Sequence, residues 1–321
     1  MSKASILLFL SIILLEVVHN TYTTLDGSQF IPLSYSPNVQ YDPREIVSQD
    51  NINQEMLSYY SWFASYGYCQ DVDIPLLCCK NFLDFFNEEW TMIAESSTSK
   101  YFNYNFVIWR NDKYMKYIFA FPGTRNNIIE LLNEATNIEL VNYDNKDNGI
   151  KVVNYFYKVA LEIRNLIFTT EILNDIYAHP GYQTIFIGHS LGGAVSAIQL
   201  YDAFNNKFIS QENNPALITF GMPRTGNEDW VIDFNSKIKN VLRVVRDGDI
   251  VASLPYSPIN NPYNHLGGLI LVNKEMNSMN YCPKEIGEDY PDKECVRTKS
   301  IDLKYHMNYF NPDTPLPTRC S

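Results

Sequence analysis

The stretch Gly188-His189-Ser190-Leu191-Gly192 limits the possible folds of this chain more than any other feature. Residues 184–187 before it are β-branched and aromatic, which predicts a buried strand, and residues 194–204 after it predict a helix. A serine between a strand and a helix stands on a strained turn, and glycines two positions away leave room for neighbouring backbone. The helix N-terminus favours negative charge beside that serine. We therefore expect a nucleophile elbow with Ser190 at its tip, although five-residue matches of this kind also occur in ordinary turns.

Strand and helix patterns alternate through the middle of the chain. Beyond the elbow, the predicted elements are strands over residues 104–109, 114–121, 216–220 and 240–245, and helices within residues 53–68 and 149–168. Alternation of this kind predicts the α/β class, with a mostly parallel sheet flanked by helices on both faces. No linker rich in Pro, Gly or Ser interrupts residues 100–310, which favours one domain over two.

The N-terminus has the composition of a secretory signal peptide, with Lys3 ahead of an apolar run over residues 6–15. We expect the signal to cover residues 1–20, with cleavage within about four residues of that boundary. A membrane anchor is the alternative, although the run is shorter than a bilayer-spanning helix requires. Residues 21–50 predict an irregular arm, and residues 51–321 predict a single catalytic domain. The chain is therefore expected to be secreted, or to enter the lumen of the secretory or a lysosomal-type pathway.

The formal net charge of −11 limits the partners of the chain. Lys3 and Glu16 leave together with the signal, so the mature chain keeps this charge. A surface of this sign repels nucleic-acid phosphates and gains little from anionic membranes. We therefore expect no nucleic-acid partner, no membrane span after signal removal, and lipid contact only through apolar groups. The sequence indicates no oligomeric state.

The cysteines form an even set in a chain with a secretory signal, which favours disulfides over metal ligation. They are Cys69, Cys78, Cys79, Cys282, Cys295 and Cys320. Their spacings match no zinc site, and the chain has only five histidines. We expect neither a metal ion nor an organic cofactor.

An activated serine needs a general base, and most of the histidines can be eliminated as candidates. His19 leaves with the signal, His179 lies in a turn before the elbow strand, and His189 lies inside the elbow, pointing away from the face that Ser190 presents. The remaining candidates are His265 and His306, which both follow the serine as the order Ser, Asp, His requires. Its position near the C-terminus favours His306, and His265 stays the alternative.

The acid is expected after a later strand, where it would accept the imidazole Nδ1 proton and stabilise the imidazolium. Asp249 and Asp247 both follow the strand predicted over residues 240–245. Asp249 precedes apolar residues and is favoured, whereas Asp247 lies at the tip of a turn. The oxyanion donors are expected to be the backbone N–H groups of Leu191 and Thr124, because these residues follow the nucleophile and an earlier strand.

Taken together, these motifs resemble the class 3 lipases, the fungal-lipase-like branch of the α/β-hydrolases, over residues 53–320. The matching blocks are Phe121-Pro122-Gly123-Thr124, residues 188–194, residues 219–227, residues 246–255, and His306 ahead of Tyr309-Phe310. The resemblance implies the α/β-hydrolase fold and a triad of Ser190, Asp249 and His306. It also places the oxyanion hydroxyl residue on Thr124 and makes His265 a nearby non-catalytic histidine.

The resemblance also implies a lid and a set of disulfides. Residues 127–140 carry an amphipathic pattern that fits a short mobile lid helix, with a core helix as the alternative. The implied bridges are Cys69–Cys320 and Cys282–Cys295, which leaves Cys78 and Cys79 as a vicinal disulfide or as two free thiols.

The expected function is that of a secreted serine esterase or lipase. Acylglycerols are the expected substrates, and the lid would make transient contact with a lipid interface. Alternatives on the same scaffold are a phospholipase or a feruloyl-type esterase. A non-catalytic lipid-binding protein that kept the fold is the alternative from another class.

Overall fold

The computed structural model describes residues 47–48, 52–66, 68, 90–96, 104–123, 138–255, 262–282 and 302–310. These residues all belong to one compact unit, residues 41–321. The predicted signal over residues 1–20 lies outside the described residues, and so does the predicted arm over residues 21–50 apart from Val47 and Ser48. No helix among the described residues is long and apolar enough to span a membrane.

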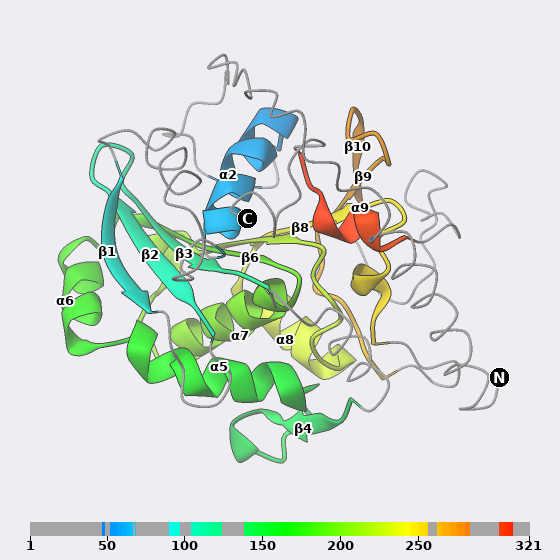
Figure 1. Ribbon diagram of the computed structural model, residues 1–321. Coiled ribbons are helices and arrows are strands. Elements are labelled where there is room, and N and C mark those ends of the chain that lie inside the picture. The colour runs from blue at the N-terminus through cyan, green and yellow to red at the C-terminus, as the bar shows by residue number, and fades with distance from the viewer. Residues whose placement is uncertain are drawn as a thin grey trace. The chain divides into compact units, whose positions relative to one another are not determined.

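An eight-stranded sheet forms the centre of this unit (Figure 1). Across the sheet the strands are β1 (Thr91–Ser96), β2 (Phe106–Asn111), β3 (Lys116–Phe121), β6 (Gln183–His189), β7 (Ala216–Phe220), β8 (Asn240–Arg246), β9 (Leu269–Val272) and β10 (Met279–Cys282). Strands β3, β6, β7, β8 and β9 run parallel, and antiparallel pairs extend the sheet at both edges. The predicted mostly parallel sheet is confirmed.

The central strands are mostly apolar and are buried because helices cover both faces of the sheet. Every residue of β6 and β7 is buried. Phe186 of β6 stacks on Phe119 of β3, with ring centroids 4.5 Å apart. Continuous burial of this kind keeps the carboxyl end of β6, where the elbow begins, in a fixed position.

The helices pack against the sheet as the alternating sequence pattern predicts. They are α2 (Gln54–Tyr66), α5 (Asn154–Ile167), α6 (Thr170–Ala178), α7 (Leu191–Asn205), α8 (Glu228–Lys237) and α9 (Leu303–Met307). Helix α2 packs on β3 and β6, while α7 packs on β3, β6 and β7 and carries α5 on its outer side. Figure 1 shows α2 on one side of the sheet and α5 and α7 on the other.

A second, two-stranded sheet follows the predicted lid. It pairs β4 (Leu140–Asn142) with β5 (Lys151–Val153) in antiparallel register. The predicted lid over residues 127–140 lies outside the described residues except for residues 138–140, and Leu140 already belongs to β4. The helix predicted for this segment therefore does not extend to Leu140.

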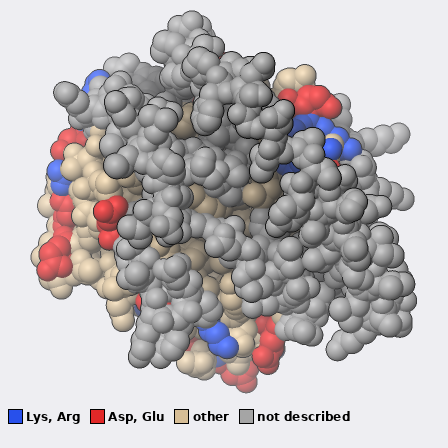
Figure 2. All heavy atoms as spheres, in the orientation of Figure 1, with Lys and Arg blue, Asp and Glu red and all other residues tan. Residues whose placement is uncertain are grey.

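The charged side chains that are described lie toward the edges of the face shown in Figure 2, with acidic and basic groups next to each other at the upper right, at the left and at the bottom. Acidic groups occur at several separate places along its edges, as a net charge of −11 leads one to expect.

Candidate active site

The elbow forms where the sequence predicts it, between β6 and α7. Ser190 is the residue before the first turn of α7 and has φ 57° and ψ −129°. A positive φ is unfavourable for a residue with a side chain, so this conformation marks a strained position that the surrounding structure must hold. One restraint is the hydrogen bond from the Ser190 N–H to the carbonyl of Phe220, 2.9 Å long, which ties the tip of the elbow to the end of β7.

The elbow glycines are required because backbone passes close to them on both sides. A Cβ on Gly188 would collide with the carbonyl of Gly192, and a Cβ on Gly192 would collide with the carbonyls of Phe121 and Pro122. The segment after β3 therefore lies directly against the elbow, as an oxyanion loop must.

The same loop continues past the serine. A Cβ on Gly123 would lie 2.8 Å from Ser190 Cβ. Tyr104 also holds the loop by donating its hydroxyl to the carbonyl of Pro122 at 2.5 Å. Burial raises the pKa of Tyr104 well above its usual value, so this hydroxyl stays protonated and continues to donate. Thr124 is the next residue and lies outside the described residues.

A buried carboxylate and imidazole lie together on the far side of the elbow. The Nδ1 atom of His306 is 3.0 Å from Asp249 Oδ2 and 3.1 Å from Oδ1, and both side chains are fully buried. Backbone N–H groups of Val251 and Ala252 donate to Asp249 Oδ1 at 2.8 and 3.3 Å. The described backbone partners of the carboxylate are donors, and a carboxylate accepts from a ring N–H, which places the proton of His306 on Nδ1. The Nε2 atom of His306 is then an acceptor.

Tyr309 is a further partner of this carboxylate that the sequence did not single out for a role. Its hydroxyl donates to Asp249 Oδ2 at 2.6 Å and accepts the backbone N–H of Arg246 at 3.1 Å. Tyr309 is fully buried. In the sequence, Tyr309 stood out only as part of the Tyr-Phe pair that follows His306 in the family resemblance. No local pattern indicated that Tyr309 contacts Asp249.

Helix α9, which carries His306, is held on the loop that carries Asp249. The N–H of Asp302, the N-cap of α9, donates to the carbonyl of Gly248 at 3.0 Å. Gly221, with φ +60°, lies beneath the pair: a Cβ there would be 2.6 Å from Asp249 Oδ2 and 2.8 Å from His306 Nδ1. The site therefore needs a residue without a side chain at position 221.

The two residues kept as alternatives lie in other environments. His265 is buried, and its Nε2 donates to the carbonyl of Ala252 at 2.8 Å, so it supports the backbone beside Asp249. The N–H of Asp247 donates to Val272, which places Asp247 where the chain leaves β8. The structure thus brings Asp249 and His306 together and gives His265 a backbone contact.

Two polar atoms at the centre of the site have no hydrogen-bond partner among the described residues. They are Ser190 Oγ and His306 Nε2, and both are buried. Buried polar atoms in folded proteins nearly always have partners, so each unpartnered atom calls for an explanation, and a catalytic role supplies one for this pair. A hydroxyl and an imidazole nitrogen without its proton are the donor and the acceptor that general-base activation requires.

The remaining predictions for the site concern Leu191, the cysteines and metal ions. Leu191 is the first residue of α7 and is buried, so its N–H belongs to the first turn, where helical N–H groups have no partner within the helix. Cys282 is disulfide-bonded, and the other five cysteines lie outside the described residues. Among the residues that the structure describes, no cluster of His, Cys, Asp or Glu could hold a metal ion.

Comparison with known proteins finds lipases that are similar to this chain in sequence. Residues 118–258 match the model of the family described as Lipase (class 3). A lipase of Rhizopus niveus is 26% identical over 289 residues, which cover 88% of this chain and 69% of that lipase. A lipase of Rhizomucor miehei is 26% identical over 280 residues, which cover 86% of this chain and 72% of that lipase.

A solved structure of a triacylglycerol lipase, described as having a serine protease triad at its catalytic centre, has the same fold. It superposes with a TM-score of 0.70 at 23% identity, covering 84% of this chain and 98% of that lipase. The fold and these relatives define a carboxylic ester hydrolase with the α/β-hydrolase fold. Within that class, the family model over residues 118–258 and the fungal relatives make the chain similar to the class 3 lipases.

Removal of the Tyr309 hydroxyl is expected to slow ester hydrolysis. In Tyr309→Phe, Asp249 loses one donor and should hold the Nδ1–H of His306 less firmly, so kcat/KM is expected to fall about tenfold, the effect of one hydrogen bond to a charged group. Tyr201→Phe is the matched control, because Tyr201 also donates to a carboxylate, that of Asp233, on α8. Equal kcat/KM in the two variants would contradict a role for Tyr309 in the site.

Proposed function

We propose that this chain is a secreted lipase that hydrolyses the carboxylic esters of acylglycerols, with Ser190 as nucleophile, His306 as general base and Asp249 as its partner. The observation that carries the proposal is the buried Asp249–His306 pair, whose free nitrogen lies in the same site as a strained, unpartnered serine hydroxyl.

In the first step, Ser190 Oγ attacks the carbonyl carbon of the ester and His306 Nε2 takes the hydroxyl proton. The tetrahedral oxyanion accepts hydrogen bonds from the backbone N–H groups of Leu191 and Thr124. The C–O bond to the alcohol then breaks, and His306 returns its proton to the leaving oxygen. This step leaves an acyl-enzyme and a free alcohol.

In the second step, water attacks the acyl-enzyme while His306 again acts as base, and the carboxylic acid and free Ser190 are released. Asp249 stays ionised throughout, because two backbone N–H groups and the Tyr309 hydroxyl also donate to it. Its task is to keep the His306 proton on Nδ1 and to stabilise the imidazolium.

A structural relative supports the proposed acylglycerol substrate, and the disulfide of Cys282 supports the proposed secretion. The solved relative with the same fold is a triacylglycerol lipase, and we extend that substrate class to this chain. Disulfide bonding of Cys282 fits an oxidising compartment and agrees with the signal sequence predicted over residues 1–20. We assign residues 127–140 as a lid that opens at a lipid surface.

A substrate profile tests the proposed function. The purified chain is expected to release fatty acid from emulsified triacylglycerol faster than from phosphatidylcholine vesicles or from methyl ferulate. The triacylglycerol rate is expected to rise when the substrate passes its solubility limit, because a lid opens at an interface. Faster hydrolysis of phosphatidylcholine or of methyl ferulate would replace the acylglycerol assignment with the corresponding alternative.

A further inference from the structure

A chain of hydrogen bonds crosses the elbow and joins the predicted oxyanion loop to the segment that carries the base. The N–H of Gly123 lies 2.7 Å from Tyr68 Oη, and Tyr68 Oη lies 2.6 Å from His189 Nδ1. On the other side of the ring, His189 Nε2 lies 2.9 Å from the carbonyl oxygen of His306. His189 is the last residue of β6, directly before Ser190.

The chemistry of the end groups fixes the direction of the two outer hydrogen bonds, and a neutral His189 then sets the direction of the middle one. A carbonyl oxygen only accepts, so His189 Nε2 must carry a proton and donate it to His306. In a neutral imidazole Nδ1 is then an acceptor, and Tyr68 must donate its hydroxyl proton to it. The Tyr68 oxygen keeps a lone pair for the Gly123 N–H. All three hydrogen bonds are therefore satisfied at once by a neutral His189.

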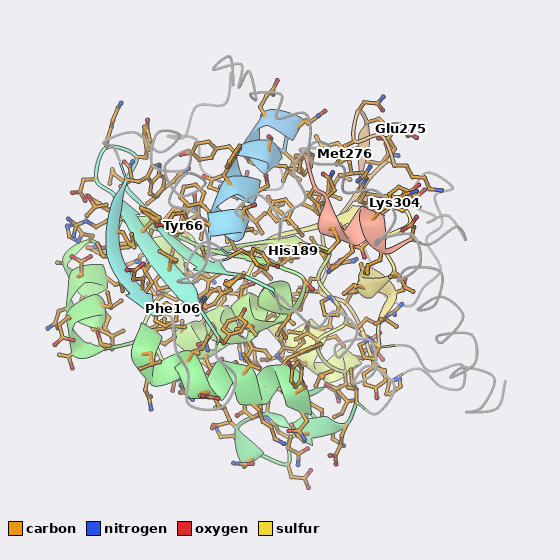
Figure 3. The ribbon with its side chains drawn as sticks, viewed as in Figure 1. Tyr66, Phe106, His189, Glu275, Met276 and Lys304 are labelled. Carbon is orange, nitrogen blue, oxygen red and sulfur yellow. The ribbon has the colours of Figure 1, made fainter. Side chains whose placement is uncertain are left out.

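The rings also pack in a way that restrains the base. The imidazoles of His189 and His306 are stacked, with centroids 4.7 Å apart and planes 29° from parallel. The Tyr309 ring packs edge-on against His189 at 6.0 Å. Figure 3 labels His189 at the end of β6, between α2 and α9. His189 is 1% exposed, so the hydrogen bonds through it are shielded from water.

We propose that Tyr68 and His189 are positioning residues that fix the oxyanion loop at Gly123 and the backbone of His306 relative to Ser190. The inference rests on the proposed function, since it assigns a role in the same reaction. The described hydrogen bonds of both side chains go to each other and to backbone. Tyr68 fixes the backbone at Gly123, and His189 fixes the backbone at His306. The oxyanion donors and the base are then already in position when the transition state forms.

The Tyr68→Phe variant is the mildest test, because it removes one oxygen and keeps the ring. Gly123 loses its acceptor and His189 Nδ1 loses its donor. Misplacement of a catalytic group by about 1 Å costs on the order of a hundredfold in rate, so we expect kcat to fall about tenfold to a hundredfold. KM for a soluble ester such as p-nitrophenyl butyrate is expected to stay within about twofold, because ground-state binding does not depend on the oxyanion donors.

Substitutions at His189 separate the hydrogen bonds from ring packing. His189→Gln keeps a donor and an acceptor and is expected to retain most of kcat, whereas His189→Leu keeps only the bulk and should lose as much as Tyr68→Phe. The double variant with Tyr68→Phe and His189→Leu is expected to be no slower than the worse single variant, since both changes break one connected chain.

Tyr157→Phe is the matched control, because the Tyr157 hydroxyl also accepts a backbone N–H, that of Asp144, at 3.0 Å. Rates are referred to the concentration of folded protein, measured by near-UV circular dichroism. If Tyr68→Phe lowers the melting temperature as Tyr157→Phe does but leaves kcat unchanged, Tyr68 has only a structural role and the proposal is wrong. Additive losses in the double variant would also overturn it.

Ser190→Ala in the same assay separates this inference from the proposed function. If Ser190→Ala is inactive while Tyr68→Phe and His189→Leu keep full kcat, only the positioning role fails. If Ser190→Ala remains active, the proposed function itself fails, whatever the other variants show.

Discussion

The Ser190→Ala variant is expected to lose hydrolysis of p-nitrophenyl butyrate and p-nitrophenyl palmitate almost completely, by about a millionfold in kcat. Without Oγ no acyl-enzyme can form, and the remaining groups can only polarise the ester and bind it. Alanine is smaller than serine at a position with positive φ, so the fold should survive. Release of p-nitrophenol under substrate saturation measures the loss.

Ser196→Ala is the control for the loss of a buried hydroxyl from helix α7. Ser196 is also fully buried, and its hydroxyl donates to the carbonyl of Gly193 at 2.8 Å. We expect its kcat to stay close to that of the natural chain. Undiminished hydrolysis by Ser190→Ala would exclude Ser190 as the nucleophile, and an inactive natural chain that still binds lipid would favour the lipid-binding alternative.

The second large effect is expected at His306. In His306→Ala the serine loses its base and the leaving alcohol loses its acid, so kcat is expected to fall about as far as in Ser190→Ala. Asp249 would also become a buried carboxylate without its cationic partner in the reaction. Hydrolysis of p-nitrophenyl butyrate by folded protein measures the effect.

His265→Ala is the comparison that decides between the two candidate bases. His265 donates a hydrogen bond to the Ala252 carbonyl and supports backbone, so its removal should lower stability and reduce kcat less than about tenfold. If His265→Ala is inactive while His306→Ala keeps its activity, the assignment of the base is wrong.

The parts of the fold that local sequence determines could be predicted well. Strand β7 covers residues 216–220 as predicted, because a buried parallel strand is a continuous apolar run. The predicted strand over 114–121 begins later, at Lys116, since Met115 has φ 53° and belongs to the turn. Helix α7 begins at Leu191 rather than at residue 194. The low helix propensity of Gly192 and Gly193 favoured the later start, whereas in the structure both glycines are helical and are required by close packing.

In the candidate site, the sequence predicted only those residues whose local motif indicates a role. The flanking glycines indicate Ser190, and the expected order Ser, Asp, His along the chain limits the acid and the base to a few candidates. The residues that position the predicted triad could not be predicted in this way. Tyr309 contacts Asp249 across 60 positions of sequence, and His189 contacts Tyr68 across 121. Such contacts join segments that are far apart in the sequence, and no local pattern encodes how those segments pack.

The late position of α9 in the chain has a consequence for biosynthesis. Ser190 and Asp249 leave the ribosome before residues 302–310, and the α9 N-cap joins the acid loop through the Asp302–Gly248 hydrogen bond. With the roles proposed for these residues, a nascent chain whose sheet has already formed is catalytically silent until α9 docks. Hydrolytic competence would then depend on the docking of residues 302–310 and not on formation of the sheet alone.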